Sequence, residues 1–249
     1  MDFSNKLFGI QHDLSLLLSS EELSKNLHLD IEFVYNPLDY AKDNHLKFLY
    51  AYANNPKKLL FMGINPGPWG MVQTGIPFGE VAVVRDWLKL NGEIVPPQHQ
   101  HPSRLVKGFS CKRSEVSGRR FWTLVKDISK SDPQLFFKNS FIYNYYPLAL
   151  VSKSGKNITP SDLKANEQKK LFNPCDAALR QIVSLLQVQI VVAIGRFAEK
   201  RAKEALKEFP FIKVVSIPHP SPRNAKSNQN WHEKTLAQFA QLDLLKYFT

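Results

Sequence analysis

Two polar side chains stand between prolines and glycines in segments that directly follow apolar, β-prone runs. Asn65 lies in GINPGPWG, which overlaps the end of the run KLLFMG, and His219 lies in PHPSP after the run KVVSI. Proline fixes φ, so the backbone around both residues is stiff. An amide in such a place can orient a water molecule, and a histidine can stabilise a developing anion. An ordinary glycine-rich turn and a buried structural histidine are the alternative interpretations.

Two further side chains near expected strand ends could recognise a flat ring. Phe78, in the turn Pro77-Phe78-Gly79, offers a face on which a base could stack, worth roughly 1–3 kcal/mol per base. Asn144 carries the donor and the acceptor needed to read a pyrimidine edge. Core packing is the alternative for Phe78. For Asn144, the residues alone favour a buried amide satisfied by the backbone.

Several other chemistries are excluded by missing patterns. The loop 63–70 has neither the GxGxxG spacing nor a following GK[ST], and no GxSxG, HExxH or paired catalytic carboxylates occur. Cys111 and Cys175 are too few for a four-cysteine zinc or iron–sulfur site, and His99 with His101 gives only two ligands. We therefore expect no metal and no cofactor. No obvious acid lies near Asn65, so any base acting there should be weak.

The elements that must position these residues alternate along the chain. Strands are expected at 58–63, 140–145, 189–195 and 213–217. Helices are expected at 39–53, 80–90, 114–128, 161–187 (broken near Pro174), 196–208 and 231–246, and Leu7–Leu18 fits an amphipathic helix. This alternation predicts an α/β fold whose parallel sheet has helices on both faces. The site is then expected beyond the carboxyl ends of the strands.

Composition places the chain among globular proteins. It has 249 residues, 43% of them apolar, and no linker long enough to separate two domains, so we expect one domain over 1–249 with an N-terminal helical extension over 1–50. The longest apolar run, Ile190–Ile194, is too short to span a bilayer, and no secretory signal is recognised. We expect a cytoplasmic monomer with free thiols and no membrane partner.

The charge is strongly basic and unevenly placed. The formal net charge is +11, from 33 Lys and Arg against 22 Asp and Glu. Six basic residues and one acid, Glu115, lie between 104 and 120, and a second concentration surrounds Arg223, Lys226, His232 and Lys234. Solvated faces and a phosphate-binding stripe are equally good interpretations of this composition.

These residues resemble the single-strand-selective monofunctional uracil-DNA glycosylases, a family within the uracil-DNA glycosylase superfamily. The resemblance covers about residues 58–235 and is strongest in seven stretches. They are GINPGPWGMVQTGIPFGEV, VRDWL, SEVSGRRFW, YNYYPL, NITPSDL, NPCDAAL and HPSPRN. It implies a three-layer sandwich around a central, mainly parallel four-stranded sheet, and an enzyme that flips a damaged base out of DNA and excises it.

The resemblance also implies roles for the residues at the strand ends. Asn65 resembles the residue that orients the attacking water, and His219 the one that stabilises the departing uracil anion. Asn144 resembles the uracil-reading amide and Phe78 the stacking platform. The substrate-binding residues Gly67 and Met71 resemble the part of the pocket near C5 of the base. No lysine lies in either motif, so a Schiff-base lyase step is not expected.

DNA is the implied partner. Arg223 resembles the wedge that fills the gap left by the flipped base, and the loop residues Ser221, Pro222, Asn224 and Lys226 would contact the backbone. Ile64 and Trp69 stand where animal members are expected to have methionine and phenylalanine. These departures indicate a bacterial subgroup acting at the nucleoid, whereas a eukaryotic member would act in the nucleus. Xanthine and other deaminated bases remain candidate substrates.

Two alternatives remain open at this stage. The first is a non-catalytic binder of uracil-containing or single-stranded DNA, which would use the same pocket without cleavage. The second is an enzyme that uses this fold on a free nucleoside. The second predicts activity that does not depend on salt, because no phosphate track would be involved.

Overall fold

A parallel four-stranded sheet forms the centre of the molecule. The computed structural model describes residues 3–20, 31–222 and 230–249. The strand order is β3-β2-β6-β7, and every neighbouring pair is parallel. The strands are β2 (Leu59–Gly63), β3 (Ser140–Asn144), β6 (Ile190–Ile194) and β7 (Lys213–Ile217).

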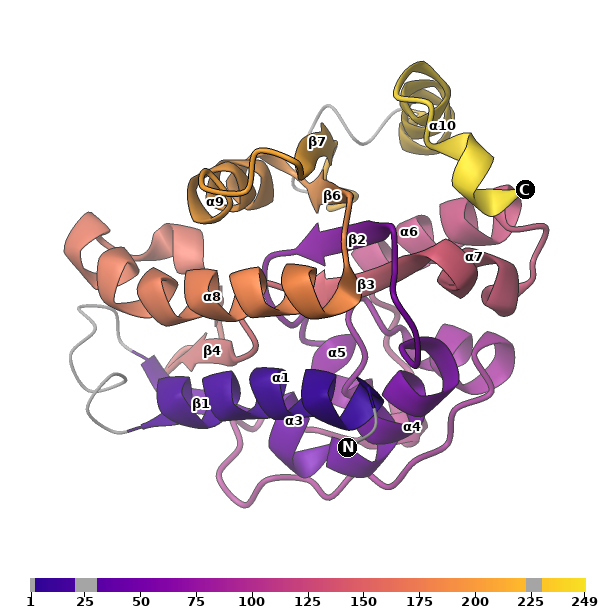
Figure 1. Cartoon of the computed structure of the whole chain (residues 1–249). Coiled ribbons are helices and arrows are strands. Elements are labelled where there is room, and N and C mark those ends of the chain that lie inside the picture. The colour runs from indigo at the N-terminus through magenta and orange to yellow at the C-terminus, as the bar shows by residue number, and fades with distance from the viewer. Residues whose placement is uncertain (1–2, 21–30, 223–229) are drawn as a thin grey trace.

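Helices cover both faces of this sheet, which is why its two central strands, β2 and β6, contain no polar side chain (Figure 1). One face carries α8 (Ala165–Leu186) and α9 (Arg196–Ala205). The other face carries α6 (Val116–Ile128), α7 (Pro133–Asn139) and α10 (Trp231–Gln241). The three-layer α/β sandwich expected from the sequence is confirmed.

One aromatic side chain shows how the second face is packed. The ring of Phe61 in β2 lies 5.4–6.0 Å, centroid to centroid, from Phe121 of α6, Phe136 of α7 and Phe239 of α10. Such tilted and edge-to-face pairs add to the hydrophobic gain from burial. The helices are thereby joined through the strand whose end carries the Asn65 loop.

A second, antiparallel sheet of three short strands was not predicted. Its order is β1-β4-β5, and the strands are β1 (Ile31–Tyr35), β4 (Ala149–Ser152) and β5 (Asn157–Ile158). The runs are only two to five residues long, and their partners lie far apart in sequence, with Tyr35 opposite Ala149. Periodicity over so few residues carries little signal.

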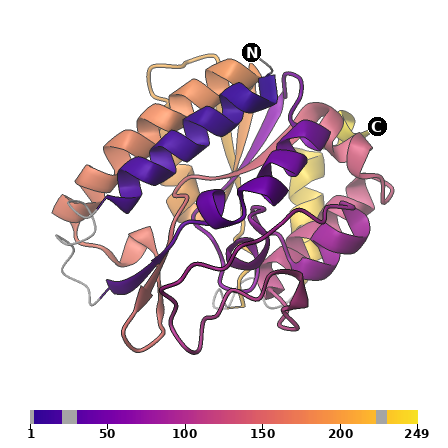
Figure 2. The same cartoon turned by 90° about the horizontal axis from the view of Figure 1, so that it is seen from below.

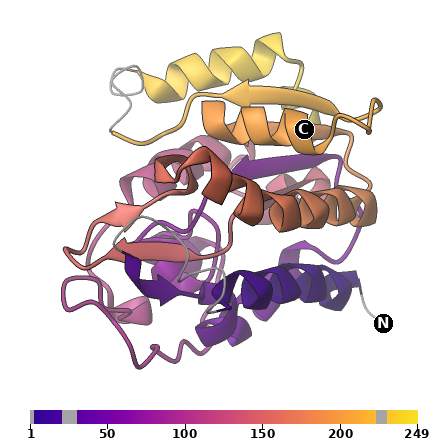
Figure 3. The same cartoon turned by 90° about the vertical axis from the view of Figure 1, so that its left-hand side faces the viewer.

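Within the first fifty residues, the described ranges 3–20 and 31–50 pack into the body of the protein. Helix α1 (Phe3–Ser19) lies beside α8, as Figures 2 and 3 both show. It is followed, beyond the undescribed segment, by β1, α3 (Pro37–Tyr40) and α4 (Lys42–Tyr52). Leu7 and Leu18 of α1 join the main hydrophobic core.

Several helices differ from the sequence expectation. Helix α8 runs without a break through Pro174, so the predicted break is wrong. Pro174 costs one backbone hydrogen bond, but burial of the apolar side of this long helix outweighs that loss. The expected helix 80–90 contains the π-helical turn η1 (Val83–Trp87), and α7 was not expected. The remaining short elements are α5 (Met71–Thr74), η2 (Gly108–Ser110), η3 (Pro160–Asp162) and η5 (Leu245–Phe248).

The order of the strands sets the place where a ligand can bind. The chain leaves β2 for β3 on one side and later returns to β6 on the other side of β2. The segments that follow β2 and β6 therefore diverge at their carboxyl ends. In open α/β sheets this divergence creates the binding crevice.

Candidate active site

Asn144 closes β3 with a buried amide that has an unused acceptor. The residue is 4% exposed, and its Nδ2 donates to the Sδ atom of Met71 at 3.1 Å. Its Oδ1 has no hydrogen-bond partner within the described ranges 3–20, 31–222 and 230–249. A buried acceptor left unpaired costs about 1–3 kcal/mol, so this oxygen favours a ligand that donates an N–H group. From the residues alone, the favoured interpretation of Asn144 was an amide whose hydrogen bonds the backbone satisfies. Oδ1 does not fit that interpretation.

Gly63 allows the two ring-recognition residues to meet. It ends β2 directly opposite Asn144. A Cβ atom at position 63 would lie 2.4 Å from Oδ1 of Asn144 and 2.6 Å from Cε2 of Phe78. Both side chains therefore occupy the space that the missing side chain leaves, and a larger residue at position 63 would displace them.

Phe78 is held in an unusual backbone conformation beside this amide. Its φ is 55°, in the left-handed region, and its carbonyl accepts from the indole Nε1 of Trp122 at 3.0 Å. Gly118 permits this approach, because a Cβ there would lie 2.3 Å from the Phe78 oxygen. The ring lies 6.3 Å from the ring of His219, centroid to centroid. Phe78 thus connects the β2 end with the β7 end.

His219 follows β7 and is held as a neutral ring. Its Nδ1 accepts from the backbone N–H of Ser221 at 3.0 Å, so the neutral ring carries its proton on Nε2. Burial lowers the pKa of His219 to about 4. Gly195, with φ of 93°, follows β6 directly, and a Cβ there would lie 3.0 Å from Cβ of His219. Such a ring can donate a hydrogen bond without carrying a charge.

Asn65 lies in the loop that leaves the same strand end. It is two residues beyond Gly63, half-buried, and its Nδ2 donates to the carbonyl of Pro66 at 3.2 Å. The loop is tied to the β3 end by the Tyr146 N–H, which donates to the Ile64 carbonyl at 2.8 Å. The predicted residues Phe78 and Asn144 therefore meet at Gly63, where the Asn65 loop starts. Met71 contacts Asn144, and His219 lies beside Phe78.

An acidic side chain that the sequence placed only among the basic residues of 104–120 lies against this loop. Glu115, at the start of α6, accepts from the backbone N–H of Trp69 at 3.1 Å. A Cβ at Gly67 would lie 2.6 Å from its Oε2. The expectation that no acid lies near the Asn65 loop is wrong, because 46 residues separate Glu115 from Trp69 in sequence. The stretch SEVSGRRFW, singled out only by resemblance, was the available signal.

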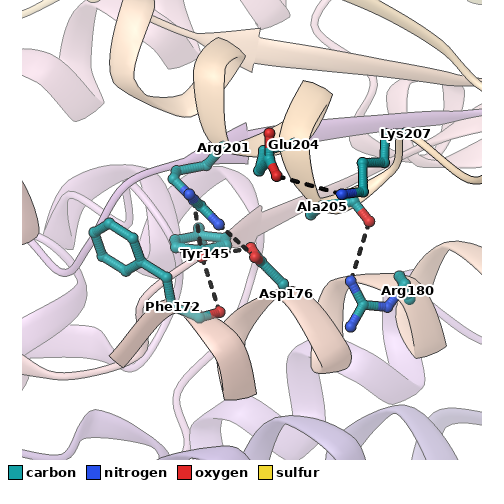
Figure 4. Close-up of polar contacts among 8 residues, drawn as sticks. All are labelled: Tyr145, Phe172, Asp176, Arg180, Arg201, Glu204, Ala205 and Lys207. Carbon is teal, nitrogen blue, oxygen red and sulfur yellow. Dashed lines mark hydrogen bonds and ion pairs between the residues drawn. The ribbon is translucent and has the colours of Figure 1, made fainter. Parts of the chain in front are cut away.

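The segment after Asn144 is anchored by a buried polar network (Figure 4). The hydroxyl of Tyr145 donates to Oδ1 of Asp176 in α8 at 2.6 Å, and Arg201 of α9 pairs with Oδ2 of the same carboxylate. Burial, together with the nearby Cys175 and Asp176, raises the pKa of Tyr145, so its hydroxyl stays protonated. Arg201 also lies over the ring of Phe172, 4.7 Å from its centroid. The network joins the β3 end to two helices.

The expected DNA-binding residues are only partly described. Ser221 is half-buried and Pro222 is exposed, whereas Arg223, Asn224 and Lys226 lie outside the described residues. Within residues 3–20, 31–222 and 230–249, no group of three or more His, Cys, Asp or Glu side chains could hold a metal ion. In the same ranges, no helix is long and apolar enough to cross a membrane. Cys111 and Cys175 are both free and buried.

Comparison with known proteins identifies the family. The model of the uracil DNA glycosylase superfamily matches residues 50–241. The single-strand selective monofunctional uracil DNA glycosylase of Mus musculus is 44% identical over 237 residues, which cover 92% of this chain and 85% of the relative. The Bos taurus enzyme of the same name is 45% identical over 220 residues, covering 88% and 80% of the two chains.

A solved structure shares the fold. The crystal structure of wild-type SMUG2 from Pedobacter heparinus superposes with a TM-score of 0.69 at 20% identity, over 98% of this chain and 99% of that one. The family match and the curated relatives agree with the resemblance found in the motifs. The chain belongs to the uracil-DNA glycosylase superfamily and, within it, to the family of single-strand selective monofunctional uracil-DNA glycosylases.

Proposed function

We propose that this protein is a monofunctional DNA glycosylase that excises uracil and closely related damaged bases and leaves an abasic site. The observation that carries the proposal is the buried Asn144 amide, whose unpaired Oδ1 lies with Phe78 beside His219 at the strand ends. A uracil ring presents an N–H between two carbonyls. It can therefore satisfy this oxygen and present a carbonyl to a histidine donor at the same time.

Binding is proposed to use the two residues around Gly63. The flipped base stacks on the ring of Phe78, and Oδ1 of Asn144 accepts the N–H of its pairing edge. Gly67 and Met71 shape the pocket near C5, and Met71 also fixes the amide through its 3.1 Å contact with Nδ2. A correctly paired base costs more free energy to unstack than a mismatched or damaged base. The cost of flipping therefore adds to the selectivity for damaged bases.

The chemistry requires charge separation in a dry site. The bond between the sugar carbon C1′ and the base nitrogen breaks, and its electron pair leaves with the base as an anion. His219 donates from Nε2 to the O2 atom of that anion, which is the interaction that strengthens in the transition state. Asn65 orients the water molecule whose oxygen forms the new bond to the cationic C1′. That water loses one proton to solvent, and the departing base anion takes up one proton, so charge balances. A strong base is not required because the carbon is already electron-poor.

DNA contacts are proposed for the loop after His219. Arg223 fills the gap left by the flipped nucleotide, while Ser221, Pro222, Asn224 and Lys226 hold the backbone of the strand. The net charge of +11 favours a polyanionic partner. We propose that the protein acts as a monomer wherever the cell keeps its DNA, at a bacterial nucleoid or in a eukaryotic nucleus.

The test is an abasic-site assay with an excess of protein over substrate. Oligonucleotides carry uracil, hydroxymethyluracil, hypoxanthine or xanthine, each in single and double strands, and abasic products are cleaved by alkali. We expect product from uracil in at least one strand context, and no strand cleavage before alkali because no lyase step occurs. Binding of uracil DNA without product would favour the non-catalytic binder, and cleavage of free deoxyuridine alone would favour the nucleoside enzyme.

A further inference from the structure

Helix α6 contacts three separate loops of the proposed site within its first turns. Glu115, at the helix start, accepts the N–H of Trp69 in the Asn65 loop at 3.1 Å. Trp122 donates to the carbonyl of Phe78 at 3.0 Å. Arg120 donates through Nη1 to the carbonyl of Pro220, which follows His219 directly, at 3.0 Å. The loops come from 67–70, 78 and 220, so only the folded chain brings them to one helix.

Glu115 fills a space that two glycines leave for it. A Cβ at Gly67 would lie 2.6 Å from Oε2 of Glu115, and a Cβ at Gly70 would lie 3.0 Å from its Cγ. The carboxyl group therefore lies against the backbone of the loop. Burial raises the pKa of Glu115, the Trp69 N–H opposes this effect, and the nearby Glu80 adds to it. Burial at this place disfavours the charged carboxylate. We therefore look for the role of Glu115 in the position of the loop that its side chain contacts.

We propose that Glu115 and Arg120 are positioning residues that hold the Asn65 loop and the His219 loop against one helix and thereby fix the distance between the two catalytic side chains. The inference rests on the proposed function. The prolines at 66 and 68 make the segment between Asn65 and Trp69 stiff. A shift at Trp69 is therefore passed on to Asn65 instead of being absorbed by bond rotation.

The energetic argument is one of orientation. The attacking water and the departing base lie on opposite sides of the sugar carbon C1′. Asn65 acts through the water and His219 acts through O2 of the base, so one reacting centre is served from two different loops. A misplacement of about 1 Å at such a centre can cost roughly a hundredfold in rate. One helix that holds both loops sets their separation by its own rigid geometry. Its contacts are Glu115 to the Asn65 loop and Arg120, five positions later, to the His219 loop.

The test separates the reach of the side chain at 115 from its charge. Glu115→Gln keeps the length and an oxygen acceptor but removes the charge, whereas Glu115→Asp keeps the charge and shortens the reach by one methylene. We expect single-turnover excision of uracil at saturating protein to stay within about threefold for Gln and to fall about tenfold or more for Asp. Affinity for uncleavable DNA should change little in either variant, so the loss appears in the chemical step.

A second pair of variants applies the same test at the other loop. Arg120→Ala removes the donor to Pro220, and Arg120→Lys retains a cationic donor. Arg119→Ala is the matched control, because it removes the same charge from the adjacent position, and the Arg119 guanidinium has no hydrogen bond to either loop within the described part of the chain. We expect the rate to fall for Arg120→Ala, to recover in part for Arg120→Lys, and to be unchanged for Arg119→Ala.

The outcomes are distinguishable from a failure of the proposed function. Absence of excision by the unmodified protein would overturn the function itself and, with it, this inference. If the unmodified protein excises uracil, equal rates for Glu115→Asp and Glu115→Gln, or a lower rate for Gln, would overturn the positioning role. A loss of rate that only follows the folded fraction, measured by thermal unfolding of each variant, would overturn it too.

Discussion

At the scale of single residues, the site depends on neutral donors and acceptors. His219 accepts a hydrogen bond from Ser221 on Nδ1, which fixes its proton on Nε2, and burial lowers its pKa to about 4. Asn144 is buried with an unsatisfied acceptor next to the ring of Phe78. Neutral donors and acceptors suit a reaction in which charge appears only in the transition state, because they need not be desolvated as ions.

The pH dependence of excision follows from this lowered pKa. Above about pH 4 the ring of His219 is neutral and accepts from the Ser221 N–H; below it, the protonated Nδ1 becomes a donor and loses that bond. We expect the single-turnover rate to be level from pH 8 to about pH 5 and to decline toward pH 4. A descending limb centred near 6.5, the ordinary histidine value, would show that the ring is not held as described.

At the scale of elements, the site exists because parallel strands end at one edge and helices hold the segments that follow. The segment after β3 is anchored through Tyr145 to Asp176 of α8, which pairs with Arg201 of α9. The side chains of Arg201 and Asp176 are only 14% and 11% exposed. Loss of either partner therefore leaves a charge with little access to water.

This network predicts a specific change in stability. Asp176→Ala leaves the Arg201 guanidinium unpaired and should lower the free energy of unfolding by about 3 kcal/mol. The double variant Asp176→Ala, Arg201→Met, which replaces the stranded charge with an apolar side chain of similar length, should regain a large part of the loss. Urea unfolding of the three proteins measures both values. A double variant less stable than Asp176→Ala would contradict the account.

The sequence was most informative where a pattern extends over a whole element. The runs that became β2, β3, β6 and β7 were found to within one residue at each end. In β2 and β6, burial on both faces leaves a continuous apolar signal. Once these strands were placed, the candidate site residues could be found in the segments that follow them. Their roles came from the family resemblance, and they stay predictions until measured.

Contacts between distant segments were not predictable in the same way. The strands β1, β4 and β5 are too short for periodicity, and Glu115 reaches Trp69 only through the tertiary fold. The predicted break at Pro174 was wrong because local propensity was outweighed by packing of the whole α8 helix. The single-domain organisation and the roles of Arg223, Asn224 and Lys226 remain untested predictions.

At the scale of the whole molecule, some positive charges pair with carboxylates, and two guanidinium groups near the site lie over an aromatic ring. On α9, Nζ of Lys203 lies 2.7 Å from Oε1 of Glu199. Lys47 and Asp43 of α4 form a similar pair four residues apart. Arg104 and Arg113 instead lie over the ring of Trp69 in the Asn65 loop, 5.2 and 4.4 Å from its centroid. In the described ranges, neither guanidinium has a carboxylate partner.

Salt dependence should separate these two classes of charge. Each phosphate contact releases counterions, so Arg104→Ala and Arg113→Ala should each reduce the slope of log affinity against log salt by about one. Lys203→Ala, which removes a cation already paired with Glu199, serves as the control and should leave the slope unchanged. Fluorescence anisotropy with a single-stranded uracil oligonucleotide measures the slope. Equal slopes for all three variants would place DNA elsewhere on the surface.

The most direct measurement compares the rate of excision with the affinity for DNA in Asn65→Ala and His219→Leu. Single-turnover excision of uracil at saturating protein should fall about a hundredfold or more in each variant, because each removes an interaction made in the transition state. Affinity for an uncleavable uracil oligonucleotide should stay close to that of the unmodified protein. An excision rate near the unmodified level in either variant would contradict the account of this site.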